Sequence, residues 1–187
     1  MNIIVKPYGS DMCYCRPDTT WERDNRDFYS PECVNEVIWA PVIFARISKA
    51  GKCIGTKFAS RYYDAVGCGM LMYGGNNDLA YGSCIDHTSI LPSPMYNPVV
   101  LDEQKVLTVM LRHADGPSDQ SDFILENAKC MLEDALCKAS QLTSLRIGDY
   151  VAVELAPLSP LAEKSAGELS VKGTFCENEI FGFKIIF

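Results

Sequence analysis

The segment from Val37 to Ile47, VIWAPVIFARI, limits the fold more than any other part of the sequence. Its β-branched and aromatic residues favour a strand, which ends at the turn-like sequence SKAGK. Pro41 cannot donate a hydrogen bond to a neighbouring strand, which indicates a kink or a sheet edge. Residues 70–73 and 106–111 are also apolar and strand-like. We therefore expect a β-rich domain.

One long helix is expected among these strands. Apolar residues recur at spacings of three and four from Ile124 to Leu142, and Ser121 or Asp122 is suited to cap the helix. A shorter helix is expected from Phe58 to Ala65. The pattern predicts a β-rich α+β fold with one long helix over about residues 121–142 and a few short helices.

The length of the chain fits a single domain. A chain of 187 residues with 48% hydrophobic and 22% charged residues can bury one core and has an ordinary globular composition. Prolines and glycines make the early part of the chain turn-rich, after a strand over residues 2–6. We expect one domain over residues 1–187, with an irregular N-terminal segment over 1–36 and a core over 37–187.

Charge and hydropathy exclude several kinds of partner. A net charge of -7 opposes binding to a nucleic-acid backbone. The apolar runs are shorter than the ~20 residues of a membrane span, and the N-terminus lacks the apolar core of a signal peptide. The nine cysteines are scattered, which predicts reduced thiols and a cytoplasmic protein. Cys13 and Cys15 lack the Cys-x-x-Cys spacing of a redox or zinc pair.

Motifs for common chemistry are missing from the sequence. It has no zinc-binding His-x-His or His-Glu-x-x-His, no phosphate-binding glycine loop and no Gly-x-Ser-x-Gly elbow. His87 beside Asp86 is a candidate for an oriented base. Adjacent residues on an extended segment point in opposite directions, however, and an isolated histidine is more often a surface residue.

Two regions of the chain resemble the fumarylacetoacetate hydrolase family. KAGKCIGTKFASRYYDAVGCGMLM is similar to the family segment that follows a metal-bearing strand with a Gly-Lys turn, a short helix ending in Tyr-Asp-Ala-Val and a glycine entering the next strand. LTSLRIGDYVAVELAPLSPLA and GELSVKGTFCENEIFGFKIIF resemble the family's later strands. The resemblance implies a mixed β-sheet roll, usually a homodimer, with magnesium or manganese that helps to cleave or decarboxylate acylpyruvate-like β-dicarbonyl acids.

The residues that match the family's metal ligands are apolar here. The family's Glu-x-Glu pair falls on Ala40 and Val42, and its third carboxylate falls on Leu71. The strand from Val37 to Ile47 has no carboxylate in any register. The substrate-contacting Arg-Asp-x-x-Gln motif keeps only Asp78, and the early histidine of a water-activating His-Glu pair has no counterpart. We therefore expect no metal and no other cofactor.

Three functions remain open. The first is a noncatalytic homologue that binds a small ligand in a pocket at Ala40, Val42, Leu71 and Asp78, or that binds a partner as a homodimer or as a heterodimer with an active relative. The second is a divergent enzyme that acts on acylpyruvate-like acids through a rebuilt site containing Asp86 and His87, with contributions from other acids (Glu32, Glu36 and Asp64). The third is a structural or interaction protein whose pocket is filled by side chains.

Overall fold

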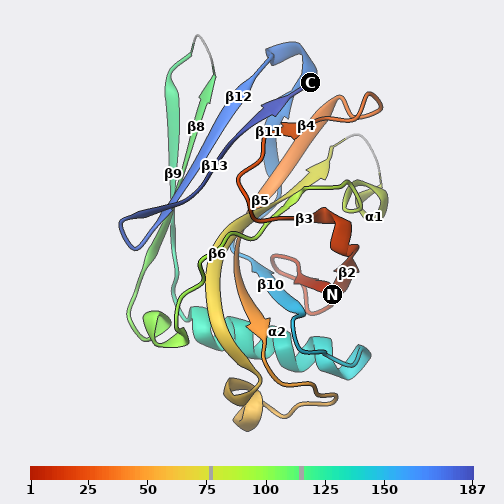
Figure 1. The fold of residues 1–187 in the computed structure, drawn as a ribbon, viewed down its shortest axis with the longest axis vertical. Helices are drawn as coiled ribbons and strands as arrows, with labels where there is room; N and C mark the ends of the chain where they lie inside the picture. Colours follow the sequence, from red (N-terminus) through yellow and green to blue (C-terminus); the bar gives the residue numbers. More distant parts are fainter. Residues whose placement is uncertain (76–77, 114–115) are drawn as a thin grey trace.

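The computed structural model describes residues 1–75, 78–113 and 116–187. Over these residues the chain forms two β-sheets and one long helix (Figure 1). The larger sheet has the order β2-β1-β10-β5-β6-β7-β3, with β11 paired to β5, and the smaller has the order β4-β13-β12-β8-β9. The strands are β1 (Ile3–Lys6), β2 (Tyr14–Arg16), β3 (Trp21–Glu22), β4 (Phe28–Tyr29), β5 (Glu36–Ile47), β6 (Tyr63–Gly74), β7 (Ser89–Ile90), β8 (Val106–His113), β9 (Ser118–Ile124), β10 (Tyr150–Glu154), β11 (Ser159–Glu163), β12 (Leu169–Phe175) and β13 (Asn178–Ile186).

The two sheets are mixed, and the β-rich α+β class is confirmed. β1 runs parallel to β10, whereas β5 runs antiparallel to both β6 and β10. β5 and β6 are the longest paired strands, and they cross the middle of the larger sheet (Figure 1). Among the described residues, no helix is long and apolar enough to cross a membrane.

The long helix is shorter than the sequence predicts. Helix α2 spans Ala128–Leu142, and Asn127 precedes it with a φ of 55°. The predicted first turns belong instead to β9, which pairs with β8 so that Val106 faces Ile124. The prediction of a start near residue 121 was therefore wrong. The other helical elements are α1 (Leu79–Gly82) and the 3-10 turns η1 (Asp18–Thr20), η2 (Thr56–Arg61), η3 (Pro98–Asp102) and η4 (Lys164–Ala166).

The N-terminal segment is built into the sheets. Residues 1–36 were expected to be irregular beyond one strand, but they contribute β1 to β4, and β1 lies between β2 and β10 in the larger sheet. Burial of three consecutive residues, Ile3 to Val5, explains this position, because a strand inside a sheet with two covered faces is apolar on both sides.

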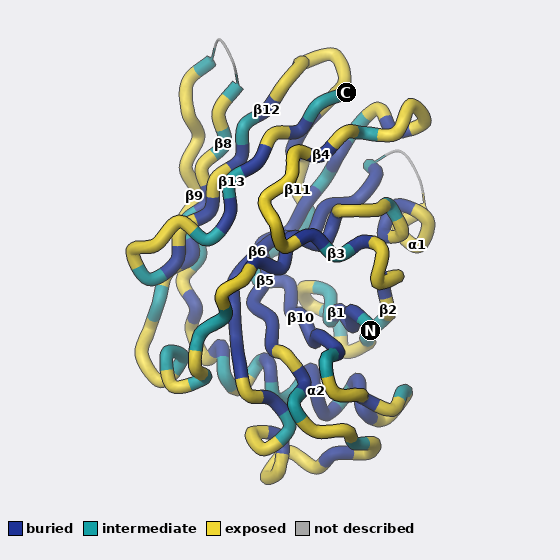
Figure 2. Tube along the Cα trace, in the orientation of Figure 1, coloured by how far each residue is buried: buried dark blue, intermediate teal, exposed yellow. Residues whose placement is uncertain are grey.

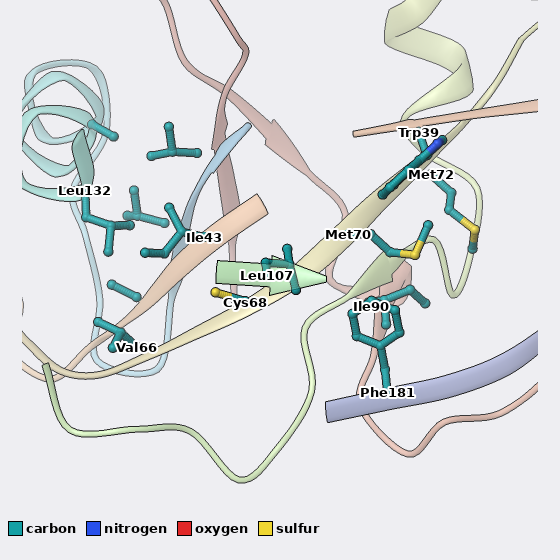
Figure 3. Close-up of a cluster of buried hydrophobic side chains, with 14 of the residues drawn as sticks. Trp39, Ile43, Val66, Cys68, Met70, Met72, Ile90, Leu107, Leu132 and Phe181 are labelled. Carbon is teal, nitrogen blue, oxygen red and sulfur yellow. The ribbon is translucent and has the colours of Figure 1, made fainter. Parts of the chain in front are cut away.

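Both faces of the larger sheet are buried at its centre (Figure 2). One face packs on the smaller sheet and on α2, where Ile43, Val66 and Met70 belong to the same cluster as Leu132 and Phe181 (Figure 3). The opposite face carries a second cluster that contains Val42 and Leu71. This second face is the one that the family resemblance assigns to the metal.

Candidate functional site

The structure brings the three predicted pocket residues of β5 and β6 together. Ala40 on β5 pairs with Leu71 on β6, and Val42 lies two residues further along the same face of β5. All three residues have 0% of their surface exposed. They therefore converge on one face of the sheet, but they lie inside the protein rather than in an open pocket.

Aromatic and aliphatic side chains fill this face. Phe44, Tyr73 and Tyr150 belong to the same buried cluster as Val42 and Leu71, and the remaining buried members are Ile3, Val5, Leu91 and Ala152. The main chain is also closely packed here, because a Cβ atom on Gly69 would collide with the carbonyl oxygen of Ile90. A ligand has no space at this position.

The donor set does not fit a divalent cation. Magnesium and manganese require oxygen ligands, and the side chains of Ala40, Val42 and Leu71 have none. Across residues 1–75, 78–113 and 116–187, no group of three or more histidine, cysteine, aspartate or glutamate residues is placed to hold a metal ion. The face that the family resemblance assigns to a metal is chemically unsuited to one.

A buried polar cluster, formed by Tyr14, Arg16, Tyr73 and Glu154, lies at one end of this apolar face. The Tyr73 hydroxyl donates to Glu154 Oε1 at 2.5 Å and lies 2.8 Å from the Tyr14 hydroxyl. Glu154 Oε2 accepts from the main-chain N–H of Tyr8 at 3.0 Å. The Arg16 guanidinium stacks 4.7 Å from the centre of the Tyr73 ring.

Arg16 ties the segment Ser83 to Thr88 to the larger sheet. It donates to the carbonyl oxygens of Ser83 and Met72 at 2.9 and 2.8 Å, and to the Thr88 hydroxyl at 2.7 Å. Its Nη1 atom has no hydrogen-bond partner within the described residues. Burial lowers the pKa of Arg16, and the neighbouring tyrosines oppose this shift. Arg16 is thus a buried positive charge that anchors a loop.

Asp78 does not join the other predicted pocket residues. Its side chain caps α1 by accepting from the main-chain N–H of Ala80 at 3.1 Å, and the residue is exposed. Asp64, considered for a rebuilt site, forms an exposed ion pair with Arg46 at 2.9 Å. Neither aspartate contacts Ala40, Val42 or Leu71 through a hydrogen bond or ion pair in the part of the chain that the structure describes.

Asp86 and His87 line an open cleft with a volume of about 890 Å³. His87 Nδ1 lies 3.2 Å from Glu22 Oε2, so the carboxylate that contacts the imidazole is not the neighbouring Asp86. The Glu22 side chain is 5% exposed and that of His87 is 54% exposed. The other lining residues are Asn25, Arg26, Asp27, Phe28, Tyr29, Pro31, Cys33, Val34, Tyr81, Cys84 and Ile85.

Sequence reasoning gave no role to Arg16, Glu22, Tyr73 or Glu154. Each partner contact joins residues that are far apart in the chain, and the N-terminal residues lie in a segment that reads as a polar loop. One feature could have pointed to Tyr73 and Glu154. They occupy apolar strands in which a polar side chain has to find a partner when it is buried.

Comparison with solved structures identifies the fold. The sequence matches no protein-family model and no curated protein. The structure nevertheless has the fold of the fumarylacetoacetate hydrolase family, as the following neighbours show. Fumarylpyruvate hydrolase from Pseudomonas aeruginosa, solved in complex with Mn²⁺ and pyruvate, has a TM-score of 0.77 and 13% sequence identity, with 100% of this chain and 90% of that chain covered.

Two further structures agree. A protein described as belonging to the fumarylacetoacetate hydrolase family, from Yersinia pestis CO92, has a TM-score of 0.76 at 13% identity, covering 99% of this chain and 92% of that chain. Maleylpyruvate hydrolase from Sphingobium sp. SYK-6 has a TM-score of 0.72 at 13% identity, covering 99% and 70%. The fold expected from the family resemblance is therefore confirmed.

Proposed function

We propose that this protein is a noncatalytic homologue at the face of β5 and β6 that matches the family's metal site. It carries out no metal-dependent hydrolysis or decarboxylation there, and it functions by binding. The observation that supports this proposal is the filled face of β5 and β6. Ala40, Val42 and Leu71 converge there, yet they offer no oxygen ligand and are fully buried. The metal-dependent chemistry that the family resemblance implies would lack both the oxygen ligands for the metal and the space for a substrate.

Binding of a partner is better supported than binding of a ligand at the old metal face, because that face has no room. We propose a second copy of this chain as the partner, with an active relative as the alternative. The outer face of β8 and β9 is suited to this contact. Val106, Met110 and Ile124 lie on one side of this hairpin and are 41%, 39% and 57% exposed.

A divergent enzyme for acylpyruvate-like acids is less well supported. Asp86 and His87 do lie in an open cleft, but Glu22 and Asp27 line the same cleft. Carboxylates repel an anionic substrate. The filled face of β5 and β6 also supports a purely structural role. That role differs from the proposed function only because it requires no partner.

We also propose a cytoplasmic location. All nine cysteines are free thiols, and several of them are exposed. Exposed unpaired thiols are typical of a reducing compartment.

Two measurements test the proposed function. Isothermal titration of the EDTA-treated protein with manganese chloride should show no stoichiometric binding, and a micromolar site that disappears in a Leu71→Phe variant would contradict the proposal.

Light scattering after gel filtration should give the mass of a dimer, and Met110→Glu should shift it to a monomer. Ile147→Glu, at an exposed apolar residue outside this hairpin, is the control for the added charge. If the wild-type protein is a monomer and also fails to associate with a coexpressed active relative, the proposed binding function is contradicted and the purely structural role is favoured.

A further inference from the structure

We propose that the open cleft is a metal-independent hydrolytic site in which His87 is the general base and Glu22 is the residue that positions it. This inference goes beyond the proposed function, because the cleft is separate from the filled face of β5 and β6. It rests on the contact between the two side chains, on the way the loop around His87 is held, and on the charge of the cleft.

The buried carboxylate fixes one edge of the imidazole ring. Glu22 Oε2 lies 3.2 Å from His87 Nδ1, and Glu22 Oε1 accepts from the main-chain N–H of Asp24 at 2.6 Å. Both carboxylate oxygens are therefore engaged, and the Nδ1–H tautomer of His87 is favoured. Nε2, on the opposite edge of the ring, is left to accept a proton from a molecule in the cleft.

The main chain holds His87 in an uncommon conformation. Its φ is 60°, in the left-handed region that few residues other than glycine adopt. The His87 N–H donates to the Thr19 carbonyl oxygen at 3.2 Å, and Arg16 fixes the loop from behind through Ser83 and Thr88. The main chain that carries the imidazole is thus fixed, and Glu22 contacts one edge of the ring, before any substrate arrives, as a positioned base requires.

The lining of the cleft indicates the class of substrate. The lining is negative on balance, because its three carboxylates, Glu22, Asp27 and Asp86, outnumber its one arginine, Arg26. Phe28, Tyr29 and Tyr81 add aromatic surface to the walls. This combination favours an uncharged or cationic ester with an apolar or aromatic group, and it opposes dicarboxylate anions.

The reaction needs only water as a second reactant. His87 Nε2 takes a proton from a water molecule while the water oxygen forms a bond to the acyl carbon of the ester. The bond from that carbon to the alkoxy oxygen then breaks, and the imidazolium returns the proton to the departing alcohol. The products are a carboxylic acid and an alcohol, and the base is regenerated.

The test uses EDTA-treated protein and three matched esters: phenyl acetate, 4-acetoxybenzoate and 4-(trimethylammonium)phenyl acetate. After division by the rate of hydroxide hydrolysis, kcat/KM should be highest for the cationic ester and lowest for the anionic ester. His87→Gln should lower kcat/KM by about 100-fold. Glu22→Gln should lower kcat by at least about tenfold with KM unchanged.

The chain supplies its own control, because its other histidine is His113 at the end of β8. His113→Gln should keep the wild-type rate. Nitrogen NMR of the two imidazoles should show His87 as the Nδ1–H tautomer in the wild type and lose that preference in Glu22→Ala, which has no side-chain acceptor. The fall in kcat at unchanged KM is the result that a merely structural role for Glu22 would not produce. The proposal is overturned if hydrolysis does not exceed that by free imidazole, if His87→Gln retains the wild-type rate, or if a burst of product accompanies stable acetylation of Cys84.

Discussion

Replacing Tyr73 with phenylalanine tests the buried polar cluster that ends the former metal face. The change removes one hydroxyl group and leaves the ring under Arg16 in place. The lost hydroxyl donates to Glu154 Oε1 at 2.5 Å and lies 2.8 Å from the Tyr14 hydroxyl. Glu154 is 4% exposed, so water cannot readily replace the missing donor.

The expected cost follows from these two contacts. A hydrogen bond to a charged group contributes about 1.5–3 kcal/mol, and one between neutral groups contributes about 0.5–1.5 kcal/mol. Tyr73→Phe should therefore lower the free energy of unfolding by about 2–4 kcal/mol. In Glu154→Gln the acceptor loses its charge, so a second replacement at Tyr73 should cost less than it does in the wild type.

Urea unfolding of the wild type, both single variants and the double variant gives the coupling energy between Tyr73 and Glu154. Tyr63→Phe is the matched control, because Tyr63 also lies on β6 and donates to Glu133 Oε1 at 3.1 Å, at a part-buried position. The control should cost about 1 kcal/mol. Costs of less than about 0.5 kcal/mol for Tyr73→Phe, or additive single effects, would refute the reasoning.

Further predictions concern packing, the anchored loop and pH. Leu71→Ala should lower the unfolding free energy by about 2–5 kcal/mol in urea titrations, because the side chain is fully buried; a smaller loss would mean an open pocket. Arg16→Met should speed amide hydrogen exchange in the loop from Ser83 to Thr88, and unchanged exchange would remove Arg16 as its anchor. Burial raises the pKa of Tyr14 from 10.0 to about 12. Titration of Tyr14 should thus lower stability between about pH 10 and pH 12 by up to about 1.4 kcal/mol per pH unit, so the fall measured above pH 10 should be less steep in Tyr14→Phe than in the wild type.

The sequence was sufficient to predict β5 and the end of β6, because both are apolar runs with both faces buried. The short helix expected from Phe58 to Ala65 was wrong beyond residue 61, because the structure has the 3-10 turn η2 over Thr56–Arg61 and β6 begins at Tyr63. The same pattern showed that the segment from Val37 to Ile47 has no carboxylate in any register. The start of α2 was misplaced because Ile124 fits a helical spacing with the residues that follow it. In the structure Ile124 is 57% exposed on β9, where pairing with β8 decides its conformation.

The candidate site was less accessible to prediction. His87 was recognised as a candidate base, but its partner Glu22 comes from a short N-terminal strand that pairs with β7. Arg16 lies in the same polar segment and is 2% exposed, although arginine is rarely buried. Sequence periodicity does not reveal which charged residues of a loop-like segment become buried under a neighbouring strand. Their burial depends on strand pairing between residues that are far apart in the chain.

A crystal structure of the protein grown with millimolar manganese, with anomalous diffraction recorded at the manganese edge, tests the central claim most directly. The account predicts no anomalous peak at the face of Ala40, Val42 and Leu71, and side chains packed there as in the present structure. An ordered manganese ion at this face, with oxygen ligands from the protein, would contradict it.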